Sequence, residues 1–296
     1  MSKLELNNDA LVRLDHGLSA DRPIVTKHDL WPEVGPGMQD MHYEVELGIV
    51  MRGRMAHRNR HWVGEFGPGD VWLTGIWEPH SAEITEVPLE LCMFHIYPPM
   101  LAQWKFPEYP DCNWLSFFTA PPEERPQQLS NRGDIWLDIA RQVLALTPDQ
   151  DRFDQLLLRP LLMRFLTELG RVWPGFEATS SIRVGTYEHI GRAIAAVFET
   201  PHRLSVTEGA DLAGMNRNVF TEKFQELMGM SFAEFSLKHR LYLASHALRE
   251  TDLPLKAIAT HFGFTDKSHL HRSFVRLFGQ TPHDYRRSNL RPVAVV

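Results

Sequence analysis

The chain of 296 residues carries 37 acidic and 31 basic side chains, which gives a formal net charge of −6. Its 43% hydrophobic and 23% charged residues are typical of a globular protein and exclude a collagen-like or disordered chain. The length favours two domains. No stretch approaches 18 uncharged apolar residues, the N-terminus lacks a signal-peptide pattern, and two cysteines are too few for a disulfide framework. We therefore expect a cytoplasmic protein without membrane contact.

The charge is divided unevenly along the chain. Residues 1–180 carry 16 Lys/Arg and 26 Asp/Glu, a net charge of −10, whereas residues 181–296 carry 15 Lys/Arg and 11 Asp/Glu, a net charge of +4. All eight tryptophans lie before residue 181. The acidity of the whole chain argues against nucleic-acid binding, but the basic second part predicts an appended module with different chemistry.

Residues 24–98 are predicted to form β-structure. Short strand candidates alternate with turns that contain glycine or proline, at Arg52-Gly53 and at Gly67-Pro68-Gly69-Asp70. The strand candidates are Tyr43–Met51, Val71–Thr74 and Leu91–Tyr97. Strands at this spacing favour an antiparallel barrel or sandwich.

Residues 98–130 hold many prolines and are expected to form an irregular connection. Apolar residues at helical spacing then predict helices at Asp134–Leu146 and Phe153–Trp173. Pro160 is expected to kink the second helix or mark its start, and Pro174-Gly175 to end it. We expect this region to form a dimer contact, although packing against the β-structure explains its apolar residues equally well.

A linker is expected at Glu177–Arg183, and helical periodicity continues after it. The predicted helices are Tyr187–Glu199, Val206–Ala213, Arg217–Met228, Ser231–Arg249, Leu255–Phe262 and Lys267–Phe278.

Two stretches of this helical part repeat each other. The first contains Ala210-x3-Gly214 and Phe220-x3-Phe224 and ends at Gly229, and the second contains Ala259-x3-Gly263 and Leu270-x3-Phe274 and ends at Gly279. In each stretch the alanine allows two helices to approach closely, and the first glycine can adopt the left-handed conformation of a tight turn. A single pattern of this kind is a packing motif as often as it is a DNA-binding unit. Two copies, however, predict a pair of helix-turn-helix units.

The second unit carries a family resemblance. The stretch Ile258-Ala259-x3-Gly263-Phe264, followed by Phe274-x4-Gly279-Gln280-Thr281-Pro282-x2-Tyr285-Arg286, resembles the signature of the AraC/XylS transcription regulators. The stretch Phe232-x2-Phe235-x4-Arg240-Leu241-x2-Ala244-x3-Leu248 is similar to the connecting helix of that family. The resemblance covers residues 185–287 and implies that both units insert into successive major-groove segments of double-stranded promoter DNA. The DNA-facing residues that it implies are Arg217, Asn218, Thr221, Lys267, Ser268, His271 and Arg272, and Glu222 is a further candidate on the first recognition helix.

Glu222 departs from the pattern, because the family often has arginine there, as this chain has at Arg272. A carboxylate cannot hold a phosphate but can accept a hydrogen bond from cytosine N4. Either Glu222 reads a base or the first unit binds DNA less tightly.

The N-terminal half carries a second resemblance. The stretches His42-x3-Glu46-x6-Gly53, Gly67-Pro68-Gly69-Asp70 and Glu78-Pro79-His80-Ser81 resemble the two motifs of the cupin superfamily, whose barrel is the effector-sensing domain of AraC-type regulators. Cupin enzymes hold a metal with His-x-His, a glutamate and a later histidine, but Asp40 stands at the first histidine position. Asp40, His42, Glu46 and His80 could form a mixed site for a divalent metal. Alternatively, the histidines contact an organic ligand or serve the structure alone.

The tryptophans bear on the nature of the ligand, because aromatic faces stack on sugar rings. The predicted effector-binding residues are His42, Glu46, His80, Trp31, Trp72 and Trp77, with a sugar as the preferred effector. Each tryptophan is individually more typical of a core position.

The fold class predicted is α+β with two domains. Residues 1–130 form a cupin-like effector-sensing barrel and its connection, residues 131–176 a helical dimerisation region, and residues 184–290 an all-α double helix-turn-helix. The predicted function is sequence-specific DNA binding controlled by a small molecule, as a homodimer that could contact RNA polymerase. We expect no catalytic residues and no required cofactor. The alternatives are a metal-dependent cupin enzyme, such as an isomerase or dioxygenase, and a metal-sensing regulator.

Overall fold

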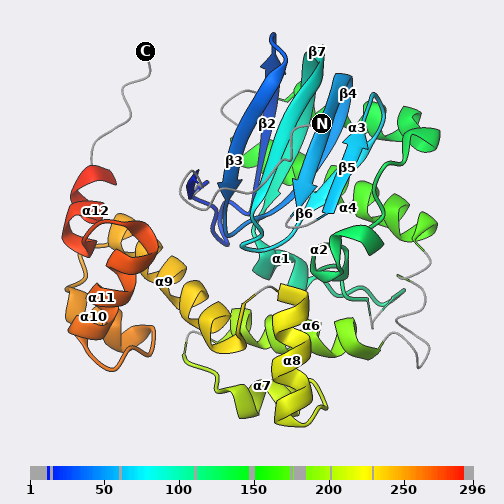
Figure 1. The fold of residues 1–296 in the computed structure, drawn as a ribbon. Coiled ribbons are helices and arrows are strands. Elements are labelled where there is room, and N and C mark those ends of the chain that lie inside the picture. Colours follow the sequence, from blue (N-terminus) through cyan, green and yellow to red (C-terminus); the bar gives the residue numbers. More distant parts are fainter. Residues whose placement is uncertain are drawn as a thin grey trace. The chain divides into compact units, whose positions relative to one another are not determined.

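The computed structural model describes residues 12–13, 16–59, 62–109, 112–146, 151–173, 176, 185–200, 202–228 and 230–289. The predicted linker Glu177–Arg183 lies outside these residues, as do Pro174, Gly175 and Gly229. Contacts divide the chain into two compact units, Met1–Gly191 and Arg192–Val296. The first is rich in β-sheet and the second is helical, which confirms a mixed fold of two parts (Figure 1). Within the described residues, no helix is both long and apolar enough to span a bilayer.

A seven-stranded sheet dominates the first unit. Its strands are β1 (Val12–Arg13), β2 (Ile24–Trp31), β3 (Gly35–Met41), β4 (Val45–Asn59), β5 (Trp62–Phe66), β6 (Val71–Thr74) and β7 (His80–Ile96). The long strands β4 and β7 pair along their whole length (Figure 1). The other edge of β7 pairs with β3 in its first half and with β2 in its second half. The other edge of β4 pairs with β6 and then with β5.

Strand β4 is longer than the sequence predicts. The predicted turn at Arg52-Gly53 is wrong, because Gly53 forms an irregularity inside β4, where the pairing with β7 shifts register. Gly53 has φ of 76°, and a Cβ atom there would lie 2.6 Å from the carbonyl oxygens of Glu86 and Pro88. Only glycine fits such a position, so the strand bends here instead of ending. The predicted turn at Gly67 is confirmed by the Asp70 N–H, which donates to the Gly67 carbonyl at 2.9 Å.

Helices follow the sheet within the first unit. They are α1 (Pro98–Gln103), α2 (Ser116–Thr119), the 3₁₀ turns η1 (Pro122–Glu124) and η2 (Ser130–Arg132), α3 (Gly133–Leu144) and α4 (Arg152–Val172). Trp136 of α3 stacks on Phe165 of α4 with ring centroids 4.7 Å apart, and Phe165 contacts Phe94 of β7. These two helices therefore pack their buried faces on the sheet. Pro160 lies inside α4 without ending it, on an exposed side of the helix.

The second unit is helical throughout its described part. Its helices are α7 (Val206–Leu212), α8 (Arg217–Met228), α9 (Phe232–Glu250), α10 (Leu255–His261), α11 (Lys267–Phe278) and α12 (Pro282–Asn289), and α6 (Gly185–Glu199) crosses the boundary between the units. The predicted helices agree with these bounds within two residues. Helix α12 was not predicted, although Thr281 caps it by accepting a hydrogen bond from the Asp284 N–H at 3.1 Å.

Candidate functional site

The two predicted helix-turn-helix units have the same turn geometry. Gly214, between α7 and α8, and Gly263, between α10 and α11, have φ of 61° and 65°. In each turn the N–H of the residue after this glycine donates to the carbonyl oxygen of the repeated alanine, Ala210 or Ala259, and both bonds are 2.9 Å long. Both alanines are buried. The repeat read from the sequence is thus a repeat of the same hydrogen-bonded turn.

Aromatic rings hold each unit together. In the first unit, Phe220 and Phe224 of α8 lie with their ring centroids 5.2 Å from that of Phe232 of α9. In the second helix-turn-helix, the ring centroids of Phe274 of α11 and Tyr285 of α12 are 5.2 Å apart. These rings are all buried, so one face of each second helix is fixed against its unit and the opposite face is left outside.

Arg240 connects α9 to the second turn. Its guanidinium is buried, and Nη1 donates to the carbonyl oxygens of Phe262 at 3.3 Å and Gly263 at 2.9 Å. The guanidinium carbon also lies 4.9 Å from the ring centroid of Phe264. Burial, with a smaller contribution from Arg203, lowers the pKa of Arg240 to about 10, so the side chain stays charged at neutral pH. The buried guanidinium of Arg240 therefore stabilises the turn of the second helix-turn-helix, between α10 and α11.

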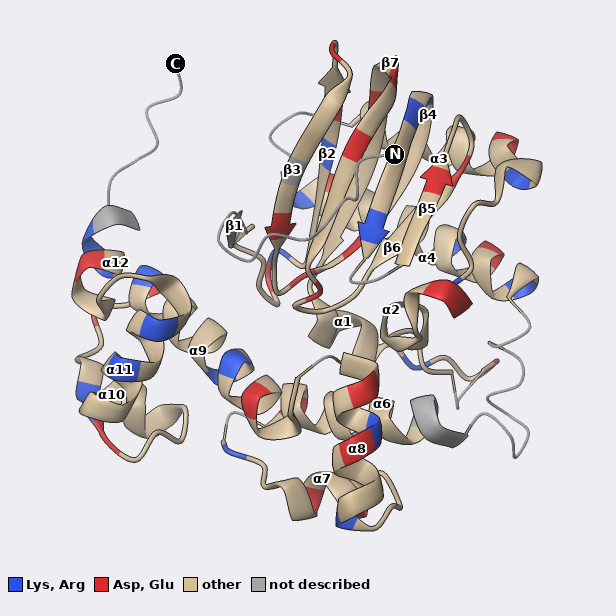
Figure 2. Cartoon of the chain, in the orientation of Figure 1, with Lys and Arg blue, Asp and Glu red and all other residues tan. Residues whose placement is uncertain are grey.

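The predicted DNA-facing residues are all exposed on the outer faces of α8 and α11. They are Arg217, Asn218, Thr221, Glu222, Lys267, Ser268, His271 and Arg272. The two helices differ in charge (Figure 2). Helix α11 carries three basic residues and no acidic one, whereas α8 carries two of each sign, and its Lys223 is paired with Glu226 at 2.6 Å.

A cavity of about 140 Å³ opens in the first unit beside β4 and β7. Its titratable wall consists of His16, Asp40, Glu46, His57, His80 and His95. Its apolar wall consists of Met55, Trp72, Ile84, Leu89, Leu91 and Met93. Strand β2 adds the partly exposed Lys27, Asp29 and Trp31. Of the predicted effector-binding residues, Trp31, Glu46, Trp72 and His80 border the cavity. His42 and Trp77 do not border it, and the Trp77 ring lies 5.7 Å from that of Tyr43.

Sheet register brings the titratable residues together. Glu46 of β4 lies directly opposite His95 of β7, and Asp40 of β3 lies directly opposite His80 of β7. Side chains opposite one another on paired strands are close neighbours, so pairing alone creates two carboxylate–histidine contacts. His57, His95 and His16 were missed as site residues. In the sequence, His95 lies among apolar residues of a predicted strand, and His57 lies in the strand after Gly53. These positions were the available signals for a buried role of the two histidines.

The carboxylate of Glu46 lies at the centre of this cluster. Its Oε1 accepts a hydrogen bond of 2.7 Å from Nε1 of Trp72. Its Oε2 lies 3.3 Å from Nε2 of His42, 3.2 Å from Nε2 of His95 and 3.7 Å from Nε2 of His80. Burial raises the pKa of Glu46, but the contacts with His42 and His95 and the charge of His80 outweigh it and hold the pKa well below its ordinary value. Glu46 is therefore a buried, ionised carboxylate.

His80 and Asp40 form a buried ion pair. Nε2 of His80 lies 2.8 Å from Oδ1 of Asp40, and Nδ1 lies 3.0 Å from the Glu78 carbonyl oxygen. Burial lowers the pKa of His80, but the hydrogen bond and charge of Asp40, together with Glu46, raise it to about 9. Since one ring nitrogen faces a carbonyl oxygen and the other a carboxylate, His80 is an imidazolium.

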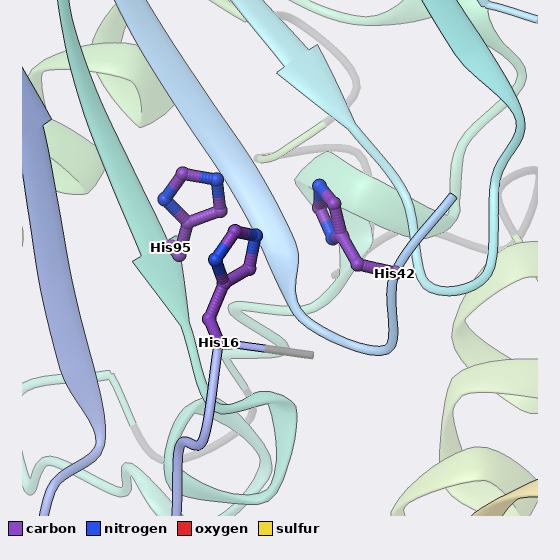
Figure 3. A group of neighbouring side chains, drawn as sticks. All are labelled: His16, His42 and His95. Carbon is purple, nitrogen blue, oxygen red and sulfur yellow. The ribbon is translucent and has the colours of Figure 1, made fainter. Parts of the chain in front are cut away.

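Three further histidines gather beside Glu46. His16 precedes β2, His42 lies between β3 and β4, and His95 lies on β7 (Figure 3). The ring centroids of His16 and His95 are 3.9 Å apart, and those of His42 and His95 are 5.3 Å apart. Burial lowers the pKa of His95 to about 4 and lowers that of His16 further. Both rings are therefore neutral at physiological pH.

Glu78 of the second predicted motif has a structural role. Its carboxylate accepts hydrogen bonds from Arg125 Nη1 at 2.6 Å and Nη2 at 3.1 Å, and from the Gly75 N–H at 2.6 Å. Glu78 and Arg125 are both buried, so this bidentate pair fixes the loop before His80.

Comparison with known proteins identifies the second unit. Residues 210–288 match the family model described as "Helix-turn-helix domain". This match confirms the class of domain that the repeated turns define.

Individual relatives are transcription regulators by name. The RCS-specific HTH-type transcriptional activator RclR of Escherichia coli (strain K12) is 33% identical over 101 residues, which are 34% of this chain and 36% of the relative. The HTH-type transcriptional regulator AlkR of Acinetobacter baylyi is 24% identical over 167 residues, 54% of each protein. A solved transcriptional regulator of Chromobacterium violaceum, described as containing an AraC-type DNA-binding domain, is 22% identical over 37% of this chain and 99% of that one, with a TM-score of 0.34. The matched part thus spans about a third to a half of the curated relatives.

Proposed function

We propose that this protein is a sequence-specific DNA-binding transcription regulator whose promoter binding is controlled by a small molecule in the cavity of its N-terminal unit. The observation that carries the proposal is the duplicated turn, which leaves one polar face exposed on α8 and one on α11. Side chains of these types read base edges or hold phosphates in the major groove. The names of the relatives support a regulator in preference to an enzyme.

Helices α8 and α11 are proposed to contribute differently to DNA binding. Helix α11, with Lys267, Arg272 and Arg276 and no acidic residue, supplies most of the attraction to phosphate. Helix α8 has balanced charge, so it contributes mainly base reading. The Thr221 hydroxyl donates to the Arg217 carbonyl at 2.8 Å, which leaves its oxygen to accept from a base. Glu222 is exposed and suits cytosine N4.

The N-terminal unit is proposed to be a cupin-like sensor. Its cavity of about 140 Å³ is close in size to an engineered cavity of about 150 Å³ that holds benzene, so the effector is about one ring in size. Trp31 offers a partly exposed aromatic face, with Lys27 and Asp29 on the same strand. A monosaccharide fits this combination of aromatic face and polar groups better than an oligosaccharide does.

The regulator is proposed to act as a homodimer through α4. Phe153, Leu156 and Leu157 of this helix are exposed by 62%, 63% and 53%, although the opposite face of α4 is buried in the first unit. Apolar side chains on consecutive turns of one helix are typical of a contact between subunits.

DNA binding is tested by selecting sequences from a randomised duplex pool with the full chain, followed by titration at fixed salt. Arg272→Ala should weaken binding to the selected sequence by about 1–3 kcal/mol if Arg272 contacts a guanine. Arg141→Ala is the matched control, because Arg141 is an exposed arginine of the first unit. If no sequence is enriched, or if both variants bind equally well, the assignment is wrong.

The effector is tested with the same full chain. A panel of monosaccharides is screened for a rise in melting temperature and a change in tryptophan fluorescence, because every tryptophan lies in the first unit. A ligand found in this way should change the affinity for the selected DNA, since it can regulate only by differential binding to the two states. The sugar proposal is wrong if other small molecules stabilise the protein and no sugar does.

A further inference from the structure

We propose that His16, His42, His95 and Glu46 bind a divalent transition-metal ion, with Zn²⁺ as the ion that matches their chemistry best. Three imidazoles and one carboxylate form a donor set that zinc accepts in four-coordinate sites. One ring nitrogen from each of the three histidines lies within 4.8 Å of the others, and Figure 3 shows the rings converging from three separate segments. This inference does not depend on DNA binding.

The hydrogen bonds of His42 fix which of its nitrogens faces the cluster. Its Nδ1 lies 2.9 Å from the Glu44 carbonyl oxygen, and since a carbonyl only accepts, Nδ1 carries the proton. Nε2 of the same ring faces Oε2 of Glu46 at 3.3 Å, where either a second proton or a cation can lie between the two atoms. A lone pair and a carboxylate repel unless a proton or a cation lies between them. Orientation of a ligating histidine by a backbone carbonyl is also the usual arrangement around metal ions.

The spacing at Glu46 favours a metal ion over a proton. Two histidine nitrogens, from His42 and His95, lie 3.3 Å and 3.2 Å from the same Oε2 atom. A charge-assisted N–H···O⁻ hydrogen bond is shorter, about 2.7–2.9 Å. Ligand atoms about 2.0–2.1 Å from a tetrahedral zinc ion are about 3.3 Å from each other. Each of the two nitrogens therefore already lies at the distance from Oε2 that separates neighbouring zinc ligands.

Two buried nitrogen atoms of the cluster lack protein partners. Among the described residues, Nε2 of His16 and Nδ1 of His95 make no hydrogen bond, and because His95 faces Glu46 with its other nitrogen, Nε2, only the His16 atom is counted as a ligand of the ion. A buried polar atom without a partner is costly and uncommon in native structures.

His80 and Asp40 are left outside this site. Nε2 of His80 lies 2.8 Å from Oδ1 of Asp40, and Nδ1 lies 3.0 Å from the Glu78 carbonyl oxygen, so both ring nitrogens already face protein acceptors. The proposed site shares His42 and Glu46 with the set predicted from the sequence and takes His95 and His16 in place of Asp40 and His80, although Asp40, His42 and His80 also bring three donor atoms within 4.8 Å of one another. A metal ion bound in this way would tie the segment before β2 to β4 and β7.

The site is tested on the full chain, produced without a histidine tag and dialysed against a chelator. Calorimetric titration with Zn²⁺ should give one ion per chain, and Co²⁺ should give the visible absorption of a tetrahedral site. His16→Ala should weaken Zn²⁺ binding by more than about tenfold, as should His95→Ala. Zn²⁺ should raise the melting temperature of the unaltered chain and not that of His16→Ala, which removes a ligand outside the sheet.

Two controls sharpen the result. His28→Ala removes a partly exposed histidine of β2 paired with Glu90 and should leave zinc binding unchanged. Asp40→Asn should also leave it unchanged, because Asp40 serves His80. The proposal is overturned if the chain binds no stoichiometric ion, or if binding survives both His16→Ala and His95→Ala. Loss of binding in Asp40→Asn with retention in His16→Ala would overturn it in favour of the residue set predicted from the sequence.

Discussion

The buried Arg240 gives the sharpest prediction for the stability of the second unit. Its two hydrogen bonds to the Phe262 and Gly263 carbonyls, each made by a charged donor, stabilise the fold by at least about 1.5 kcal/mol apiece. Arg240→Met keeps most of the aliphatic stem and removes both bonds, so it should cost about 3 kcal/mol. Arg240→Ala also loses the packing of the stem and should cost more. Arg240→Lys retains one compact charge and should cost roughly half as much as Arg240→Met.

Urea unfolding followed with two probes measures this effect in the full chain. Every tryptophan lies in the first unit, so fluorescence reports on that unit, whereas far-UV circular dichroism includes the helices of the second. A loss of about 3 kcal/mol should lower the urea midpoint of the dichroism transition by about 1–3 M and leave the fluorescence transition in place. A methionine variant as stable as the unaltered chain would refute the reasoning, because the stem and not the hydrogen bonds would then stabilise the turn.

Two further predictions concern pH and assembly. Burial, with a smaller contribution from Arg240, lowers the pKa of His239 from 6.5 to about 3, so its stabilisation is complete above pH 6.5 and is lost as the pH falls towards 3. The second unit should lose about 1.4 kcal/mol for each pH unit below about 6, and His239→Gln should abolish that slope in dichroism-monitored unfolding; an unchanged slope would contradict the assignment. Leu157→Arg should convert the proposed dimer to a monomer in sedimentation measurements, whereas Thr167→Arg, at another exposed position of α4, should not. A monomeric unaltered chain at micromolar concentration would remove the basis of the dimer proposal.

The helical half was predictable because its signals are local. A buried alanine, a glycine with positive φ and aromatic residues four apart lie within about fifteen residues of one another, and the structure gives them the expected turn. A local signal for helix α12 is its start, Thr281-Pro282, where Thr281 caps the helix. An eight-residue helix with few apolar residues is too short to show a helical pattern of apolar residues in the sequence.

The sheet and its site were less predictable because they depend on register. Strand β7 is 17 residues long, but charged residues such as Glu86 interrupt its apolar pattern, so only the end near Leu91–Tyr97 was predicted. The contact between Glu46 and His95 joins residues far apart in sequence, and it exists only because β4 and β7 pair in one register. His16 approaches from a segment that has no strand or helix pattern, so no local signal pointed to it.

The length of helix α9 bears on the spacing of the two helix-turn-helix units. Both helix-turn-helix units pack on it, and its 19 residues at a rise of about 1.5 Å each make it about 28 Å long. One turn of B-DNA measures about 34 Å. Because the two lengths are similar, we expect α9 to space the two helix-turn-helix units for neighbouring major-groove segments of one duplex. In a DNA site bound by this protein, one segment would be contacted by α8 and a second by α11. Binding should therefore tolerate base changes at the edges of these segments far better than the insertion of half a helical turn of DNA between them.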